Sequence, residues 1–500
     1  MAKITLRRNL ILLIFFVGLC TTSFVASNFK NVDKIIDDAI FPVSELIGGI
    51  VFFSIEVTEG VNVPIVVIWL ILAGIYFTLY FRFINFRAFR HSFSLLKKTK
   101  PKGSLTGEIS HLQALTTAIS GTVGLGNIAG VAIAISIGGP GATLWMIVAG
   151  LLGMSLKFIE CTLAVKFRKT FEDGTVSGGP MYYLSIGLSE KGWPRTGAIA
   201  ASIFAFCCVL ASFGSGNMFQ ANQTFKQFII VTGGPQSSFL GFGWIFGLIL
   251  SIFVGVFIIG GIKRIVKFTQ IVVPLMALVY LTSGAIILAM HYEMIPSALL
   301  LIVSEAFSPT AVKGGMIGAL IVGFQRSAFS NEAGIGSSAI AHSAVKTDYP
   351  VTQGIVALYE PFIDTVVFCT TTALVIVVTG TFVNVQGLTG IELTSSAFES
   401  VISWFPFLLA ITVFLFAISS MVSWSYYGLK SWTFLFGEGV LQEYSYKFVF
   451  LAFIILGSSM ELSSVIHFSD AMLFAMCVPN IFGLYWLAPI VQEELTKYKF

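Results

Sequence analysis

Four glycines crowd one short stretch of this sequence, residues 120–130 (SGTVGLGNIAG), in the middle of an apolar segment. Each glycine in a helix interior costs up to about 1 kcal/mol relative to alanine, so the four together predict a broken helix. A broken helix leaves N–H groups at one half-helix end, which suit a carboxylate, and C=O groups at the other, which suit a cation. The stretch therefore has the chemistry to hold a carboxylate and a cation side by side.

The composition identifies the chain as a membrane protein that crosses the bilayer many times. Of its 500 residues, 56% are hydrophobic and 11% are charged, and the mean hydropathy is +0.89. Soluble proteins carry about 25% charged residues. Apolar segments long enough to span a bilayer predict eleven transmembrane helices. These spans are residues 61–81, 107–138, 142–167, 198–230, 239–261, 265–290, 314–341, 353–380, 404–429, 447–468 and 471–490.

A second glycine pair lies in the seventh span, in FSNEAGIGSS (residues 329–338), where Gly334 and Gly336 mirror Gly124 and Gly126 of the second span. Because an odd number of crossings separates these two spans, they run through the membrane in opposite directions. Paired interrupted helices in two inverted halves mark the binding site of a secondary transporter. The alternative is that these glycines only allow helices to pack closely.

The placement of lysine and arginine predicts the orientation of the chain. Seven of them lie between residues 82 and 102, directly after the first span, and later ones fall mostly at alternate span ends. By the positive-inside rule, the first span starts outside and the C-terminus lies in the cytoplasm. We therefore expect a multi-pass protein of the plasma membrane, the inner membrane of a bacterium.

The first 60 residues precede the predicted transmembrane domain. Lys3, Arg7 and Arg8 followed by an apolar run resemble a signal peptide, although no clean A-x-A cleavage site is present. Residues 1–26 are thus a cleaved signal peptide or a retained N-terminal anchor. Residues 27–60 contain an amphipathic stretch that we expect on the extracytoplasmic surface, and residues 61–491 form the transmembrane transporter domain.

Several motifs in order resemble the alanine/glycine:cation symporter family. They are SGTVGLGNIAGVA (120–132), GGPGA (138–142), SGGPMYYL (177–184), GNMFQANQ (216–223), FSNEAGIGSS (329–338) and EPFIDT (360–365). The resemblance covers nearly all of residues 61–490. It implies an all-α membrane protein with a leucine-transporter-type inverted repeat of five plus five helices, at roughly 107–292 and 312–491, after an extra leading helix. It also implies sodium-coupled uptake of alanine, glycine or a similar small amino acid by alternating access.

The residues expected to bind these solutes gather around the two breaks. The amino acid is assigned to Gly124, Leu125, Gly126, Asn127, Gln220, Ser330, Asn331 and Trp424. The sodium ion is assigned to Gly121, Thr122, Ser419 and Ser420, because a hydroxyl pair facing the first break completes the sodium site of the resembled fold. Structural alternatives stay open: the amide can bond a neighbouring helix, serines can bond their own helix, and the tryptophan can simply pack.

Charged residues within a membrane are functional by default. Arg326 with Glu360 or Asp364 predicts a cytoplasmic gate, and a purely structural ion pair is an equal alternative. Lys157 and Glu160, three residues apart in one helix, are expected to pair with each other.

Two rival functions stay open, namely a proton-coupled carrier that uses Glu360 or Asp364 and a transporter-like sensor that does not transport. A dinucleotide site does not fit, because no soluble βαβ unit surrounds Gly124 and Gly126. No nucleotide-binding GKS/GKT motif, zinc-binding helix or nucleophile elbow occurs in the sequence. We expect no enzymatic activity and no cofactor; the partners are a small amino acid, Na⁺ and the lipid bilayer, without nucleic acid. Enantiomer preference, stoichiometry and oligomeric state are not specified by the residues.

Overall fold

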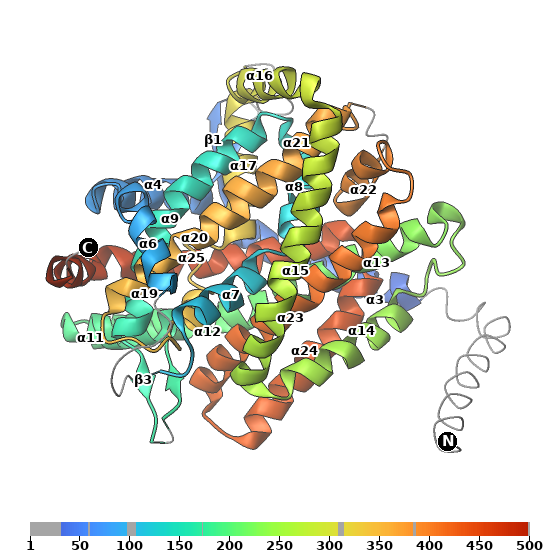
Figure 1. The fold of residues 1–500 in the computed structure, drawn as a ribbon. Coiled ribbons are helices and arrows are strands. Elements are labelled where there is room, and N and C mark those ends of the chain that lie inside the picture. The colour runs from blue at the N-terminus through green and yellow to red at the C-terminus, as the bar shows by residue number, and fades with distance from the viewer. Residues whose placement is uncertain are drawn as a thin grey trace.

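The structure is a computed structural model, and it describes residues 32–58, 61–97, 107–172, 174–308, 315–383 and 387–498. Helices dominate it and pack into one bundle (Figure 1). The strands of the described part form two short antiparallel hairpins, β1 (Ser54–Thr58) with β2 (Val61–Pro64) and β3 (Lys169–Thr170) with β4 (Val176–Ser177). The predicted helical class is therefore confirmed. The predicted signal peptide or anchor, residues 1–26, lies outside the described residues.

Seven helical stretches of the described chain are long and apolar enough to cross a membrane, or eight with the bent pair that contains the first break. Two further apolar helices are shorter, α4 (Ile65–Tyr80) and α14 (Gly243–Ile258). The predicted total of eleven crossings and the five-plus-five repeat stay predictions. The seven stretches are α9 (Ala142–Lys166), α12 to α13 (Pro194–Val231), α15 (Gly261–Met290), α19 to α21 (Pro350–Thr379), α23 (Phe405–Phe436), α24 (Val440–Ser459) and α25 (Leu462–Lys497).

Some of these stretches contain short π-helical turns. The segments within them are α12 (Pro194–Phe213), η3 (Gly214–Met218), α13 (Phe219–Val231), α19 (Pro350–Ala357), α20 (Tyr359–Pro361), η6 (Phe362–Cys369) and α21 (Thr370–Thr379). The connecting elements are α5 (Ile84–Arg87), α6 (Phe89–Lys97), α10 (Pro180–Tyr182), η2 (Tyr183–Gly187), α11 (Leu188–Glu190), η4 (Gly234–Gln236), η5 (Tyr292–Met294), α16 (Ile295–Ala306) and α22 (Ile391–Glu399). π-Helical turns inside α-helices occur frequently at functional sites.

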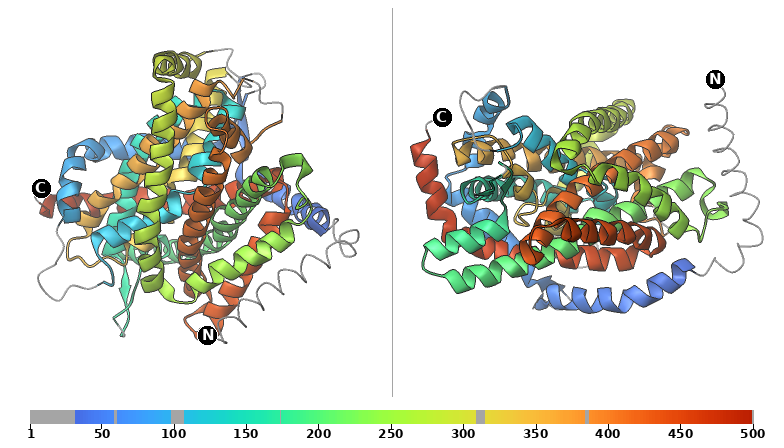
Figure 2. Two further views of the ribbon diagram at one scale, coloured as in Figure 1. Left: turned by 45° about the vertical axis from the view of Figure 1, so that its right-hand side comes forward. Right: turned by 90° about the horizontal axis from the view of Figure 1, so that it is seen from below.

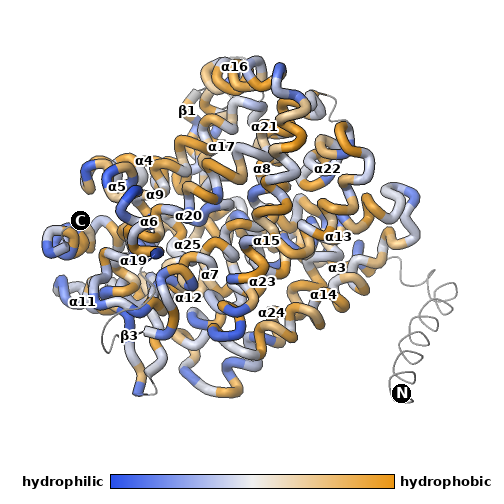
Figure 3. Tube along the Cα trace, viewed as in Figure 1, coloured by the Kyte–Doolittle hydropathy of each residue, from blue (hydrophilic) through white to orange (hydrophobic). Residues whose placement is uncertain are grey.

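Apolar side chains face outward along much of the bundle. Leu278 on α15 and Phe448 on α24 are largely exposed, as are many other leucines, isoleucines and phenylalanines. Hydrophobic colour runs along α15, α23 and α14, whereas hydrophilic residues gather near β3 and at several helix ends (Figure 3). A soluble protein rarely exposes so much contiguous apolar surface, so lipid is the medium that this surface suits.

The amphipathic stretch near the N-terminus forms a helix, α3 (Val32–Val51), which lies along the edge of the bundle (Figure 2). The Asp33 carboxylate accepts hydrogen bonds from the Gly243 and Trp244 amides (2.8 and 3.2 Å) at the start of α14, where helix N–H groups lack partners. Farther along α3, the Phe41 ring lies 6.4 Å from the His467 ring of α25. The helix is thus fixed to the bundle, while its extracytoplasmic location stays a prediction.

Candidate functional site

The first break lies between α7 (His111–Thr122) and η1 (Gly126–Gly130), which continues into α8 (Val131–Gly138), and it bends this helix pair by 52°. The Gly124 amide donates to Asn127 Oδ1 at 2.9 Å, and the Leu125 amide donates to Gln220 Oε1 at 3.2 Å. Side-chain oxygens thus occupy the backbone N–H groups of the break. A ligand carboxylate that replaced these oxygens would find the same N–H donors.

The second break separates α17 (Gly315–Asn331) from α18 (Ala339–His342). Gly334 and Gly336 have φ angles of +83° and +87°, which side-chain-bearing residues rarely adopt, so the turn requires glycine. Glu332 also has a positive φ, +57°, and such a residue outside glycine marks a strained, frequently functional position. Both predicted breaks are therefore present.

Asp364 of η6 joins the two broken segments. Its Oδ1 accepts from Asn127 Nδ2 at 2.6 Å, and its Oδ2 accepts from Ser330 Oγ at 2.8 Å and Thr365 Oγ1 at 2.9 Å. The whole side chain is buried. The carboxylate thus fixes the first break against the last turn of α17 through several charge-assisted hydrogen bonds.

Helix α23 approaches the first break closely at Gly124. A Cβ atom added to Gly124 would overlap Ser420 Oγ and would lie 3.2 Å from Gln220 Oε1. The Ser420 hydroxyl is buried and has no hydrogen-bond partner among the described residues. It therefore points a free oxygen at the broken backbone, as a sodium ligand would.

Three other predicted site residues direct their side chains elsewhere. Ser419 Oγ donates to the Phe416 carbonyl at 2.9 Å, and the Thr122 hydroxyl bonds its own helix (3.3 Å). The Asn331 amide donates to Thr365 Oγ1 at 2.9 Å. Of the predicted serine pair, the structure thus brings only the Ser420 hydroxyl to the break. The side chains of Ser419, Thr122 and Asn331 form hydrogen bonds within the protein instead.

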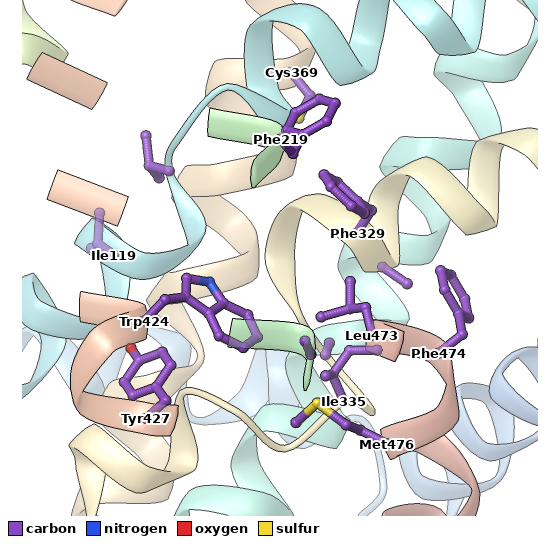
Figure 4. Packing of buried hydrophobic residues seen from close by; sticks show 14 of the residues in the cluster. Ile119, Phe219, Phe329, Ile335, Cys369, Trp424, Tyr427, Leu473, Phe474 and Met476 are labelled. Carbon is purple, nitrogen blue, oxygen red and sulfur yellow. The ribbon is translucent and has the colours of Figure 1, made fainter. Parts of the chain in front are cut away.

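Trp424 projects from α23 toward the second break. Its Nε1–H donates to Glu332 Oε1 at 3.0 Å, and its ring lies so close to Gly216 that a Cβ atom there would overlap it. The neighbouring Tyr427 ring, 5.5 Å from that of Trp424, faces Gly121 of α7 (Figure 4). Trp424, which is predicted to bind the amino acid, is therefore attached to the second break by a hydrogen bond.

The predicted pairing of Lys157 with Glu160 is wrong. Lys157 Nζ lies 3.0 Å from Glu360 Oε1, and His342 Nε2 lies 3.2 Å from Glu360 Oε2, with all three side chains fully buried. Glu160 instead accepts from Asn480 Nδ2 of α25 at 2.7 Å. The packing of distant helices, rather than spacing along α9, decides these partners.

The predicted pairing of Arg326 with Glu360 or Asp364 is also wrong. Arg326 pairs with Asp470 of α25, and both side chains are nine-tenths buried or more. The guanidinium carbon also lies 5.2 Å from the centre of the Phe329 ring, within range of a cation–π contact. The pair thus lies one helical turn before Ser330, toward the beginning of α17 and not toward α18.

Beside this pair is a cavity of about 450 Å³, which we call the α3 vestibule. It is bounded by α3, α8, α17 and α25. Its lining residues are Glu45, Gly48, Gly49, Phe52, Ile133, Ile137, Val322, Gln325, Arg326, Ile466, His467 and Asp470.

Sequence reasoning missed three residues that the structure places in these networks. Glu332 bonds Trp424, Asp470 pairs with Arg326, and Asn480 donates to the Gly334 carbonyl at 2.9 Å. Each is a polar residue within or next to an apolar segment, which is the signal that could have found them. Their partners are far away in the sequence.

Comparison with known proteins identifies the family and the fold of the chain. A sequence model described as the sodium:alanine symporter family matches residues 50–500. The sodium/alanine symporter AgcS of Methanococcus maripaludis is 39% identical over 438 residues, 87% of this chain and 94% of AgcS. The probable sodium/glutamine symporter GlnT of Bacillus subtilis is 32% identical over 437 residues, 87% of each chain. The crystal structure of MhsT in complex with L-phenylalanine has the same fold, with a TM-score of 0.53 at 15% identity, over 79% of this chain and 99% of MhsT. The chain belongs to the sodium:alanine symporter family.

Proposed function

We propose that this protein carries a small neutral amino acid, alanine or glycine, into the cell together with Na⁺ by alternating access. The observation that carries the proposal is the meeting of two broken helices at a buried site, where Ser420 directs an unpartnered hydroxyl at the first break. Its relative AgcS is named a sodium/alanine symporter.

The polarity of the first break suggests where each solute binds. Carbonyl groups at the end of α7, around Gly121 and Thr122, together with Ser420 Oγ, offer oxygen ligands for Na⁺. The N–H groups of Gly124, Leu125 and the start of η1 offer donors for the substrate carboxylate. The cation and the carboxylate then attract each other, so binding of one favours binding of the other.

The surroundings of the break suggest a small substrate side chain. The Phe219 and Phe329 rings meet edge to face with 5.0 Å between centres, and Gly126 packs against Phe329 and Ser330. Trp424 closes another side (Figure 4). These close contacts around the first break favour a substrate with a small side chain, such as alanine or glycine.

Access from the outer side is controlled, in this proposal, by Arg326 and Asp470 with Phe329 beneath them. Opening toward the cytoplasm would then require the second break to move relative to α23. The hydrogen bond between Trp424 and Glu332 joins these two parts, so it would change during the cycle. Alternation arises because the two movements expose the same site to opposite sides.

Purified protein in liposomes tests the coupling. An inward sodium gradient should raise the initial rate of labelled alanine or glycine uptake at least about fivefold over potassium on both sides, as expected if sodium contributes a coupling free energy of about 1–3 kcal/mol. Ionophore-treated liposomes without a sodium gradient serve as the control. Uptake that is unchanged by removing sodium would sink the proposal.

The proton-coupled alternative has a specific candidate in Asp364, which is buried and contacts both broken segments. We expect Asp364→Asn to lower uptake by about tenfold or more, because the new amide NH₂ would face a donor from Asn127 or from Ser330 and Thr365. The residual uptake should still require sodium. Alanine uptake that follows a pH gradient in sodium-free buffer, and disappears in Asp364→Asn, would favour the proton-coupled carrier instead.

Counterflow separates transport from sensing. Liposomes loaded with unlabelled alanine should accumulate labelled alanine transiently in the presence of sodium on both sides. Binding of labelled alanine to the protein without any counterflow would identify a sensor.

A further inference from the structure

We propose that the α3 vestibule is a second binding site, which takes a small zwitterionic amino acid on its way to the broken helices. The identity of the ligand rests on the proposed function, whereas the existence of the site rests on the cavity itself. Its volume of about 450 Å³ lies within the range of natural small-molecule sites.

The first step is the incomplete pairing of Arg326 and Asp470, which both line the vestibule. They contact each other through Nη2 and Oδ2. Arg326 Nη1 and Asp470 Oδ1 are buried and have no hydrogen-bond partner among the described residues. A buried polar atom without a partner costs about 1–3 kcal/mol, so a rotation of either side chain toward the vestibule would let the pair offer one donor and one acceptor to a ligand.

The second step is the chemistry of these two atoms. A ligand carboxylate would accept from Arg326, and a ligand ammonium would donate to Asp470. An α-amino acid carries both groups on one carbon, so it can satisfy the cation and the anion together. A lone carboxylate or a lone amine would bond only one of these two atoms and would leave the other without a hydrogen bond.

The third step is the wall of the vestibule. Ile133, Ile137 and Val322 contribute apolar surface beside the charged pair, which suits a small apolar side chain. Gly48 and Gly49 contribute no side chain at all: a Cβ atom at Gly49 would meet nothing within 4 Å. The α3 side of the cavity is therefore open enough for a ligand to occupy it.

The fourth step is the relation to the central site. Arg326 lies one helical turn before Ser330, and its guanidinium covers Phe329, which packs against the first break. An amino acid bound at Arg326 would therefore lie directly outside the aromatic layer that covers the central site. Most of α3, Val32–Val51, precedes residue 50, where the family match begins, so this side of the vestibule is built from residues outside that match.

The experiment is saturation-transfer difference NMR of alanine with the purified full-length protein in potassium buffer. Without sodium, the central site has lost its proposed coupling ion, whereas the vestibule uses only protein charges. We expect a methyl signal from alanine in the wild type. Propionate and ethylamine at the same concentration should each give at most about a fifth of it, because each lacks one of the two charges.

Variants then locate the signal. Gly49→Trp fills the vestibule and should reduce the signal at least about fivefold, while Ile50→Trp, at an exposed neighbouring position that does not line the cavity, should keep it. Gly124→Ala, which obstructs the central site, should keep it as well. Arg326→Gln should lose it, and size-exclusion chromatography checks that each variant is folded.

Three outcomes overturn the proposal: no alanine signal in the wild type, an unchanged signal in Gly49→Trp, or loss of the signal in Gly124→Ala. The last result would assign the binding to the central site. Failure of sodium-driven uptake would contradict the proposed function but not the vestibule, since the signal in potassium buffer does not depend on transport.

Discussion

Gly124→Ala is expected to lower sodium-dependent uptake by about a hundredfold, the loss that a displacement of about 1 Å at a binding site can cause. The new Cβ atom would overlap Ser420 Oγ and crowd Gln220 Oε1, so the first break and α23 must move apart. That movement separates the N–H groups assigned to the substrate from the hydroxyl assigned to sodium. Initial uptake rates in liposomes, normalised to the amount of reconstituted protein, measure the effect.

Gly130→Ala is the matched control, because it lies in the same motif but has nothing within 4 Å of an added Cβ atom. Its uptake should stay within about twofold of the wild type, as for most substitutions without a steric conflict. Adding Ser420→Gly to Gly124→Ala removes the overlapping oxygen and should restore substrate binding more than sodium affinity. Equal uptake by Gly124→Ala and Gly130→Ala would contradict the assignment of the first break.

Lys157→Met is expected to destabilise the protein by about 3–5 kcal/mol, because it leaves the buried Glu360 carboxylate without its cation. The melting temperature of the detergent-purified protein measures the loss. Replacing both partners, in Lys157→Met with Glu360→Gln, removes both charges and should recover a large part of the stability. Lys497→Met breaks an exposed ion pair near the C-terminus and should leave the melting temperature unchanged, since exposed pairs contribute little. If Lys157→Met alone melts at the same temperature as the wild type, Lys157 is not the partner that stabilises Glu360.

The two breaks could be predicted from the sequence because the effect of glycine on the backbone depends on the residue itself and not on a distant partner. Gly334 and Gly336 adopt positive φ angles that only glycine adopts at no steric cost, and Gly124 allows a close approach, so the residue type alone carries the information. The family resemblance added the expected positions of Gln220, within GNMFQANQ, and of Ser420, from the sodium site of the resembled fold, and the structure places both at the first break. What stays a prediction is the role of each residue in binding.

The partners of the buried charges could not be predicted in the same way. Spacing along one helix suggested Lys157 with Glu160, but the structure pairs Lys157 with Glu360, 203 residues later. Arg326 likewise contacts Asp470, 144 residues away. Such pairs depend on which helices pack together, and a buried charge takes the partner that packing supplies.

Helix rotation explains the mixed result for the serine pair. Consecutive residues of an α-helix point about 100° apart, so the rotation of α23 decides how closely each of the two hydroxyls approaches the break. The Ser420 hydroxyl faces Gly124, whereas that of Ser419 bonds the Phe416 carbonyl. The resemblance to a fold indicates the pair of residues but not the angle at which the helix presents them.

The buried contact between Lys157 and Glu360 also has a consequence for how the chain is made. A lysine at the centre of a membrane helix costs about 2.5–3.5 kcal/mol during insertion. Helix α9 leaves the ribosome long before the segment that carries Glu360, which follows 203 residues later. During that interval, the apolar residues of α9, whose mean hydropathy over the spanning window is 1.8, must offset the cost of the lysine. The cation gains the Glu360 carboxylate only once α20 (Tyr359–Pro361) has been made.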